Sequence, residues 1–446
     1  MPMHGFYYTS AWLRAFLCGR LETMKFKRKV LPNGLRVITI HMADTPTVTV
    51  LVMVEAGSKY ESKPISGLSH FLEHMCFKGT QKRPTAFDIS RELDSIGSQY
   101  NAFTSEEYTG YYAKAASKHV SRVIDVVSDL YLNPTFPEKE IEKEKGVIVE
   151  EINMYRDLPH RHVQELFMHL LYGDQPAGWS IAGTKETVQA MKRHDFVKYR
   201  KDHYVPDATT VIIAGNFDEQ KVQKEIKDRF AKIAKSKKQG KIKVKEVQSQ
   251  PKITIEERPT DQAHLVLGVR GFPISSPHTA TVRVLNAVLG AGMSSRLFQK
   301  LREEMGVGYY VRSSYDAYTD HGLLTVSIGS DIKRVEEVVR AIVGELNRFK
   351  KELVSEAELE KTKEYVMGTM LLGLESSDSI AEYYGYQEIL RRKLKTPQEV
   401  IGEIKKVTAK DIQKIAQKIF IDKHLNVAIV GPVKDQEKLK KALTFS

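Results

Sequence analysis

One pattern of elements occurs twice along this chain and limits the folds that it can adopt. Residues 209–230 and 425–443 each contain a buried apolar strand, a glycine, a short turn and a charged helix. Upstream of the second copy, residues 264–269 are mostly apolar, like residues 48–54, which have a strand pattern near the start of the chain. A repeated order of elements is the signature of a duplicated unit. The sequence therefore predicts two similar α/β halves.

A basic stretch joins the two halves. Six of the eleven residues from 235 to 245 are lysine, and such a charge run is typical of a solvated linker. The domains expected from this division are a first domain at 24–232, a linker at 233–250 and a second domain at 251–446, with an N-terminal extension at 1–23. The expected fold class is α+β, in which each half has an antiparallel-rich sheet flanked by helices.

The strongest chemical signal lies in an amphipathic helix predicted near residues 67–77. His70 and His74 are four residues apart, so both imidazoles project from one face and can bind a single cation. Glu73 lies beside His74 and can take a proton from a metal-bound water without being a ligand. The order His-x-x-Glu-His is that of the inverzincins. The alternative is a core helix whose two histidines have ordinary hydrogen-bond partners.

A catalytic zinc site needs a third protein ligand, often a glutamate. The helix predicted at 137–156 carries several glutamates, and its isoleucines mark the buried side. At about 100° per residue, Glu144 and Glu151 lie on the flank of that side, whereas Glu150 points to solvent. We therefore predict Glu151 as the third ligand. Glu144 is predicted to orient a ligating histidine, with a plain surface carboxylate as the alternative.

Net charge and cysteine content exclude several classes of partner. The net charge is +12, but outside the linker the basic residues are mixed with glutamates, so no nucleic-acid partner is predicted. No run of 18 apolar residues occurs, so no membrane partner is predicted. Cys18 and Cys76 are far apart in the sequence, which argues against a disulfide framework and favours a reducing compartment. Cys76 is expected to be a buried helix residue.

The first 23 residues weakly resemble a transit peptide, since they contain Arg14 and Arg20 and no acid before Glu22. The sequence from Met24 onwards would be a sufficient N-terminus by itself. We therefore interpret residues 1–23 as an extension that results from a start position placed too early. The predicted location is the cytoplasm of a bacterial-like cell, with the mitochondrial matrix as the alternative.

Several further segments have simple expectations. Residues 98–105 and 108–113 are predicted strands, and residues 184–200, 295–304 and 396–417 are predicted helices. A loop is expected around Pro159 and Gly173, so that His160 and His162 are solvated. The segment from Gly290 to Ser295 is expected to be a tight turn and not a phosphate-binding loop, because no Lys-Ser/Thr follows it.

Taken together, these motifs resemble the pitrilysin-type inverzincin metallopeptidases, in the branch of mitochondrial processing peptidase and its short bacterial relatives. The resemblance runs from about residue 27 to residue 445. It includes the His-x-x-Glu-His motif, the 76 residues between His74 and Glu151, the segment Asn101-Ala-Phe-Thr104, and residues 301–309.

The resemblance implies a clam-like enclosure of two domains, one zinc ion (Zn²⁺) per chain, and a peptide substrate. In such a zinc endopeptidase Glu73 would be the general base. Asn101 and Ala102 would bind an extended peptide at a sheet edge, and Arg302 and Tyr309 would stabilise the oxyanion. A homodimer is the expected assembly.

Two rival functions stay open at this point. The fold is shared with non-catalytic partner subunits and with core proteins of the mitochondrial cytochrome reductase, which typically have degraded one of the motifs. This chain keeps both the zinc motif and the Arg302 and Tyr309 pair. A zinc hydrolase with a non-peptide substrate is the third interpretation, and only the metal motif supports it.

Overall fold

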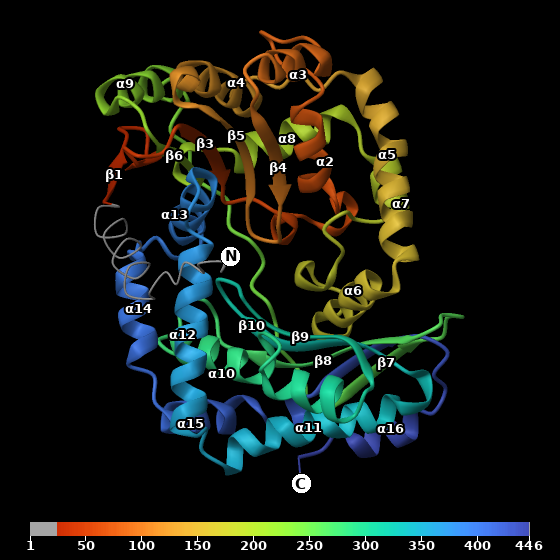
Figure 1. Ribbon diagram of the computed structural model, residues 1–446. Coiled ribbons are helices and arrows are strands. Elements are labelled where there is room, and N and C mark those ends of the chain that lie inside the picture. Colours follow the sequence, from red (N-terminus) through yellow and green to blue (C-terminus); the bar gives the residue numbers. More distant parts are fainter. Residues whose placement is uncertain (1–24, 446) are drawn as a thin grey trace, which may run out of the picture.

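The computed structural model describes residues 25–445, so the predicted extension at 1–23 lies outside the described residues. Two β-sheets, one in each half of the sequence, lie in the upper and lower parts of the molecule in Figure 1, with helices outside each sheet and between the two. The mixed fold of two similar halves that the sequence predicts is confirmed. Among the described helices, none combines the length and apolar character needed to cross a membrane.

The first sheet has six strands in the order β1-β2-β6-β3-β5-β4. The strands are β1 (Phe26–Val30), β2 (Arg36–His41), β3 (Thr47–Val54), β4 (Gln99–Thr104), β5 (Thr109–Ala116) and β6 (Thr209–Gly215). Only β2 and β6 run parallel, and the other neighbours are antiparallel. Because β4 is an edge strand, one side of its backbone has no partner strand.

The second sheet repeats this arrangement with five strands in the order β7-β11-β8-β10-β9. The strands are β7 (Lys252–Glu256), β8 (Ala263–Gly271), β9 (Gly308–Ala317), β10 (Gly322–Ser330) and β11 (Asn426–Val430). Only β7 and β11 are parallel. The same order and directions occur in β2-β6-β3-β5-β4, so β8 corresponds to β3 and β9 corresponds to the edge strand β4.

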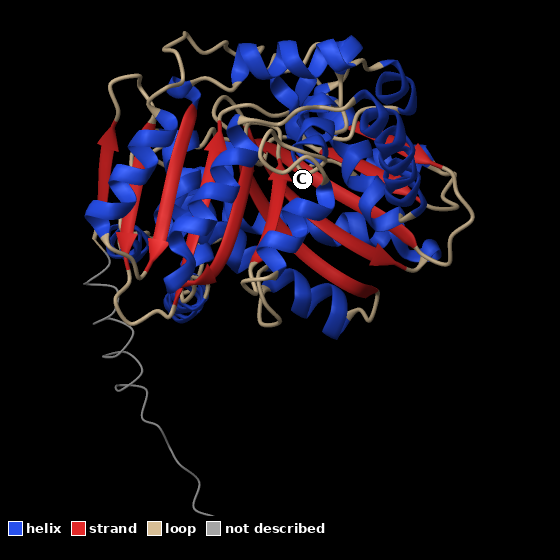
Figure 2. Ribbon diagram, turned by 90° about the horizontal axis from the view of Figure 1, so that it is seen from above, coloured by secondary structure: helices blue, strands red, loops and turns tan. Residues whose placement is uncertain are grey.

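Helices cover the strands in both halves, as Figure 2 shows in blue and red. The helices of the first half are α2 (Leu68–Cys76), α3 (Ala86–Asp94), α4 (Val120–Leu132), α5 (Glu138–Asp157), α6 (Pro159–Tyr172), α7 (Lys185–Ala190), α8 (Arg193–His203) and α9 (Glu219–Phe230). Those of the second half are α10 (Thr279–Gly290), the π-helical η6 (Phe298–Glu304), α11 (Val335–Lys351), α12 (Glu356–Leu372), α13 (Ser377–Arg391), α14 (Pro397–Lys405), α15 (Ala409–Ile419) and α16 (Gln436–Ala442).

Each half lends one helix to the other half's sheet. Helix α13 packs on β3 and β6, where Tyr384 is buried beside Leu51 and Ile212. Helix α6 packs on β11 and β8, where Phe167 is buried beside Val266. Both helices lie between the two sheets in Figure 1. Since apolar side chains from both halves share these clusters, burial of apolar surface fixes the two halves against each other.

Buried charges join the same interface. Lys59 is 1% exposed, and its Nζ lies 2.8 Å from Glu107 Oε1 and 2.7 Å from Asp320 Oδ1 of the second half. Lys241, between α9 and β7, contacts the same two carboxylates at 3.1 and 3.0 Å. The basic stretch is thus partly engaged in ion pairs, and the predicted domain boundaries stay predictions.

The prediction of a loop around Pro159 was wrong, because residues 159–172 form helix α6. Pro159 occupies the first helical turn, where its fixed φ suits the helix and its missing N–H removes no hydrogen bond. His160 and His162 therefore project from a helix. His162 Nε2 lies 2.6 Å from Glu256 Oε2, so this histidine is bound to the second half and is not free in solvent.

Three predicted helices also differ in detail. The helix expected at 184–200 is interrupted between α7 and α8, and the one expected at 396–417 is interrupted between α14 and α15. In the second case Thr408 forms a capping box with Asp411, which starts a new helix within the predicted one. The helix expected at 295–304 is π-helical and begins at Phe298.

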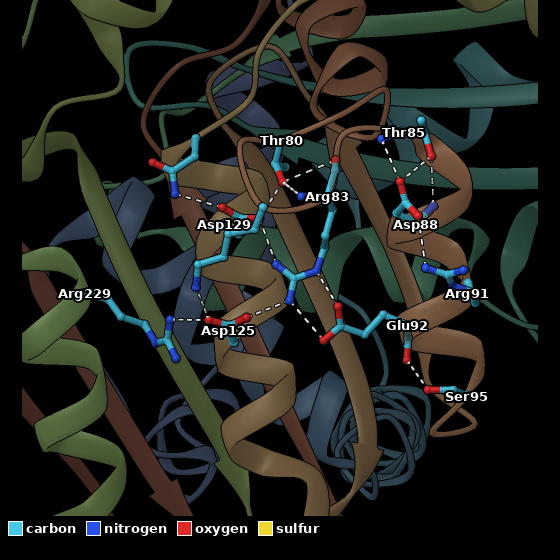
Figure 3. A network of polar contacts seen from close by, with 12 residues as sticks. Thr80, Arg83, Thr85, Asp88, Arg91, Glu92, Ser95, Asp125, Asp129 and Arg229 are labelled. Atoms are coloured by element: carbon cyan, nitrogen blue, oxygen red, sulfur yellow. Dashed lines mark hydrogen bonds and ion pairs between the residues drawn. The ribbon is translucent and has the colours of Figure 1, made fainter.

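A polar network fixes the loop that leaves α2. Arg83 is 6% exposed, and its guanidinium donates to Glu92 of α3 and to Asp125 and Asp129 of α4 (Figure 3). Arg229 of α9 also contacts Asp125. Because guanidinium–carboxylate pairs are directional, this network holds the C-terminal side of α2 in one position.

Candidate metal centre

Glu61 and Gly67 fix the position of the N-terminus of helix α2. The Glu61 carboxylate accepts hydrogen bonds from the backbone N–H groups of Gly67 and Ser69, at 2.7 and 2.6 Å. Complete burial raises the pKa of Glu61 to about 8, against the opposing effect of these hydrogen bonds. Gly67 has a φ of 97°, and a Cβ there would lie 2.5 Å from the carbonyl oxygen of Ala182. Glycine is therefore required at the start of this helix.

The apolar residues of α2 direct its polar residues into a cavity. Leu68, Phe71, Leu72 and Met75 are fully buried in the first-half core. Cys76 is buried there too, as the sequence predicts. The opposite face carries the motif residues, which line a cavity of about 850 Å³ together with parts of β4, α5 and α6.

Helix α5 brings Glu151 to the two histidines. Glu151 Oε2 lies 3.6 Å from His70 Nε2 and 3.7 Å from His74 Nε2, and one ligand atom of each residue lies within 4.8 Å of the others. In a tetrahedral site with bonds of about 2.0–2.1 Å, ligand atoms are roughly 3.4 Å apart. The two distances from Glu151 are within a few tenths of an ångström of this value, so the three side chains are grouped closely enough to bind one zinc ion.

His70 is in a form that suits metal binding. Burial, and then the neighbouring His74, lowers the pKa of His70 to about 4, so His70 is neutral near pH 7. A metal requires the neutral imidazole as its ligand. His70 Nδ1 is buried without a hydrogen-bond partner among the described residues, so its ring is held by packing rather than by a carboxylate.

Glu144 holds the second histidine. It is buried, its Oε1 lies 2.9 Å from His74 Nδ1, and its Oε2 lies 2.6 Å from Lys78 Nζ. When Nδ1 donates to Glu144, Nε2 is left free to face Glu151. Burial opposes charge on His74, but the hydrogen bond to Glu144 and the charges of the nearby carboxylates together outweigh burial and raise the pKa of His74.

Replacing Glu144 with alanine is expected to lower zinc affinity by about 10- to 100-fold, because the His74 ring loses its orienting acceptor. Competition with a chromophoric chelator measures the dissociation constant. Glu142→Ala is the matched control, since Glu142 lies on the same helix and its exposed side chain pairs with Lys145. Equal zinc affinity in the two variants would contradict the orienting role of Glu144.

Glu73 is close to the three grouped side chains without being one of them. Its Oε2 accepts a hydrogen bond from Thr104 Oγ1 at 2.6 Å. Burial raises the pKa of Glu73, although the Thr104 hydroxyl opposes this shift. A carboxylate with a raised pKa is a better proton acceptor near neutral pH.

Two polar partners were missed from the sequence. One is Thr104, in contact with Glu73. The other is Tyr155, whose hydroxyl donates to Glu151 Oε1 at 2.7 Å. Tyr155 follows Glu151 by one helical turn, so the spacing alone could have indicated this contact.

The other predicted site residues are placed differently. Asn101 and Ala102 line the cavity on edge strand β4, but Asn101 Oδ1 accepts a hydrogen bond from the N–H of Ala102 at 2.9 Å. Arg302 and Tyr309 do not line the cavity. Tyr309 is 66% exposed at the start of β9, and Arg302 donates to the carbonyl oxygen of Gly308 at 2.6 Å.

Comparison with known proteins agrees with this arrangement. Residues 36–185 match the profile of the insulinase family, peptidase family M16, and residues 190–366 match the profile of the peptidase M16 inactive domain. The zinc motif and Glu151 fall within the first match. The second match begins before α8 and ends within α12, in the part of the chain that has no His-x-x-Glu-His.

Relatives cover nearly the whole chain. An uncharacterized zinc protease of Bacillus subtilis, YmxG, is 36% identical over 91% of this chain and 98% of its own length. One from Streptomyces coelicolor is 32% identical over 92% of this chain and 90% of its own length. A crystal structure of a protease from Helicobacter pylori has the same fold, with a TM-score of 0.87 and 22% identity over 92% of this chain and all of the other.

The metallopeptidase family that the motifs resemble is thus confirmed by sequence identity over more than nine-tenths of the chain, and the relatives are named as zinc proteases. The chain belongs to the insulinase family of metallopeptidases, peptidase family M16.

Proposed function

We propose that this protein is a zinc-dependent endopeptidase that hydrolyses short or unfolded peptides. The observation that carries the proposal is the grouping of His70, His74 and Glu151 around one point, with Glu73 beside them. When bound there, zinc would supply Lewis-acid chemistry that acidifies water and polarises a carbonyl group. Family membership and the names of the relatives support this choice of metal and reaction.

Glu73 moves the proton in this proposal. Its free carboxylate oxygen accepts a proton from the attacking water, and the resulting acid donates it to the nitrogen of the leaving amine. Thr104 keeps the carboxylate in place through its hydrogen bond to Oε2. The raised pKa of Glu73 helps both transfers, since the acid formed in the first step persists until the second.

The shape of the site favours extended peptides. Strand β4 offers an unpaired backbone edge along one wall of the cavity, and a peptide can bind there as an additional strand. The bond between Asn101 Oδ1 and the Ala102 N–H would open, so that the amide of Asn101 can bind the peptide backbone instead. Binding through the backbone tolerates many side chains, whereas a folded domain offers no free strand.

Internally quenched peptides of varied length are the test of this function. We expect hydrolysis that is lost after treatment with a strong zinc chelator and restored by added zinc, with folded proteins left intact. Apo-protein that hydrolyses the peptides at the original rate would overturn the proposal.

We further propose that Arg302 and Tyr309 act on a peptide held by a second copy of the chain. Within one copy they lie outside the cavity, and the exposed side chain of Tyr309 is free to reach another molecule. Arginine and tyrosine are suited to binding a carbonyl oxygen that gains negative charge. The active form would then be a homodimer.

Mixing two inactive variants tests this arrangement. Arg302→Ala and Glu73→Gln should each have low activity as pure proteins. After subunit exchange, a mixed dimer keeps one site with Glu73 from one copy and Arg302 from the other, so activity should return to a substantial fraction of wild type. Zinc content should stay normal in both variants. No gain on mixing, with exchange demonstrated by differently labelled copies, would contradict action across two copies.

A further inference from the structure

A second cavity lies between the halves, and two arginines line it. Its volume is about 420 Å³. Arg283 enters it from α10 and Arg391 from the end of α13, while Ser105 and Glu106 enter from the loop between β4 and β5. Within residues 25–445, neither guanidinium forms a hydrogen bond or an ion pair with another side chain or a carbonyl group.

Two guanidinium groups border this cavity, where Arg283 is also exposed to solvent and Arg391 is half-buried. Arginine carries several donors in a planar fork and is normally satisfied by carboxylate, phosphate or carbonyl oxygens. Desolvation in the cavity, and then the charge of Arg391, lowers the pKa of Arg283, so the two cations oppose each other. Glu403 acts on both at longer range, but its carboxylate is paired with Lys395. An added anion would relieve this repulsion.

The acidic residues of the same cavity are already engaged. Glu107 is held by Lys59 and Lys241, and Glu106 accepts hydrogen bonds from the hydroxyls of Tyr318 and Ser105. Asp316 accepts from Ser314 at 3.3 Å. None of these carboxylates contacts either arginine, so the positive end of the cavity is free for a ligand. The negative end would repel a dianion more strongly than a single carboxylate.

Asn286 adds a second unsatisfied group. Its side chain lines the cavity, and its Oδ1 is buried without a hydrogen-bond partner. Buried acceptors normally have a donor. The two guanidinium groups can bind a carboxylate, and the amide oxygen of Asn286 can accept a hydrogen bond from an N–H next to it. The end of a peptide chain carries both groups.

The position of this cavity connects it to the candidate metal centre. Glu106 lines both cavities. Ser105 directly follows Thr104, which binds Glu73 at the end of edge strand β4. The loop that follows Thr104 therefore connects the edge strand of the first cavity to the cavity that the two arginines line.

We propose that Arg283 and Arg391 bind a carboxylate of the peptide substrate, either its C-terminal carboxylate or an acidic side chain close to that end. This inference deepens the proposed peptidase function and rests on it for the position of the peptide along β4. Two guanidinium groups bind a carboxylate through charge-assisted hydrogen bonds, and the Asn286 oxygen accepts the adjacent N–H. The two arginines would favour peptides whose carboxylate lies at the right distance from the cleaved bond.

Binding to the Glu73→Gln variant tests the proposal without requiring hydrolysis. Fluorescent peptides of one sequence are compared with a C-terminal carboxylate or amide, and with Glu or Gln as the last residue. We expect the carboxylate to improve binding by about 10- to 100-fold. Adding Arg283→Gln and Arg391→Gln together should remove that preference. Arg122→Gln, which changes an exposed arginine on α4, is the matched control.

The outcomes separate the sources of the carboxylate. Discrimination between acid and amide assigns the chain terminus, and discrimination between Glu and Gln in the amidated peptides assigns a side chain. If none of the four peptides is preferred, or if the preference survives in the double arginine variant with an unchanged melting temperature, the proposal is overturned. Because the assay needs no catalysis, a failure of the peptidase proposal would be seen separately in the hydrolysis assay.

Discussion

Glu73→Gln is expected to lower the rate of peptide hydrolysis by about 10²- to 10⁴-fold, the usual contribution of a general base, while zinc stays bound. The amide of glutamine has nearly the same shape as the carboxylate and can still accept the hydrogen bond from Thr104. It cannot take a proton from water at neutral pH. Initial rates with a quenched peptide, together with metal analysis of the same sample, measure both properties.

Glu165→Gln is the matched control for that experiment. Glu165 lines the same cavity from α6, but its exposed side chain accepts a hydrogen bond from Ser180 and lies outside the grouped ligands. We expect this control to keep most of the activity. If Glu73→Gln hydrolyses peptide at the wild-type rate, Glu73 is not the base. If the variant loses its zinc, Glu73 also acts as a metal ligand. The assignment of Glu73 as a base that is not a ligand is then wrong.

Glu151→Gln is expected to have the largest effect on metal content. The change removes the carboxylate that lies 3.6 Å from His70 Nε2 and 3.7 Å from His74 Nε2, and a neutral amide is a poorer zinc ligand than a carboxylate. We expect zinc to fall from about one ion per chain to a small fraction after dialysis, with peptide hydrolysis lost in parallel. Atomic absorption on the dialysed protein measures the content.

Glu150→Gln provides a sharp control because it changes the neighbouring residue of the same helix. Glu150 is exposed and accepts a hydrogen bond from Asn153 at 3.3 Å. Its substitution should leave zinc content unchanged. Equal loss of zinc in the two variants would mean that the inward orientation of Glu151 and the outward orientation of Glu150 do not decide which residue binds the metal.

Much of the metal centre could be predicted from local periodicity. The spacing of His70 and His74 on one helix places both rings on one face whatever the rest of the chain does. The apolar side of α5 likewise decides that Glu151 and Glu144 face inward and Glu150 outward, and the structure has this orientation. Helical geometry is local, so a short stretch of sequence is sufficient for such inferences.

Local patterns were less informative where the tertiary structure decides which surface a helix covers. A proline such as Pro159 is a local loop signal, whereas the buried contacts of Phe167 and Leu171 with the second sheet make this segment helix α6. The packing of α13 on β3 and β6 had no local signal, because its apolar partners lie far earlier in the chain, such as Leu51 on β3 and Ile212 on β6.

The sequence by itself determined the duplicated plan of two similar halves and the set of side chains that can bind one metal ion, because strand and helix periodicity is set by neighbouring residues. Only the tertiary structure decided that each half packs one helix on the other half's sheet and that Arg283 and Arg391 line one cavity. It also decided that Asn101 Oδ1 accepts the hydrogen bond of the Ala102 N–H on edge strand β4. These features depend on contacts between segments far apart in the chain, which periodicity does not encode.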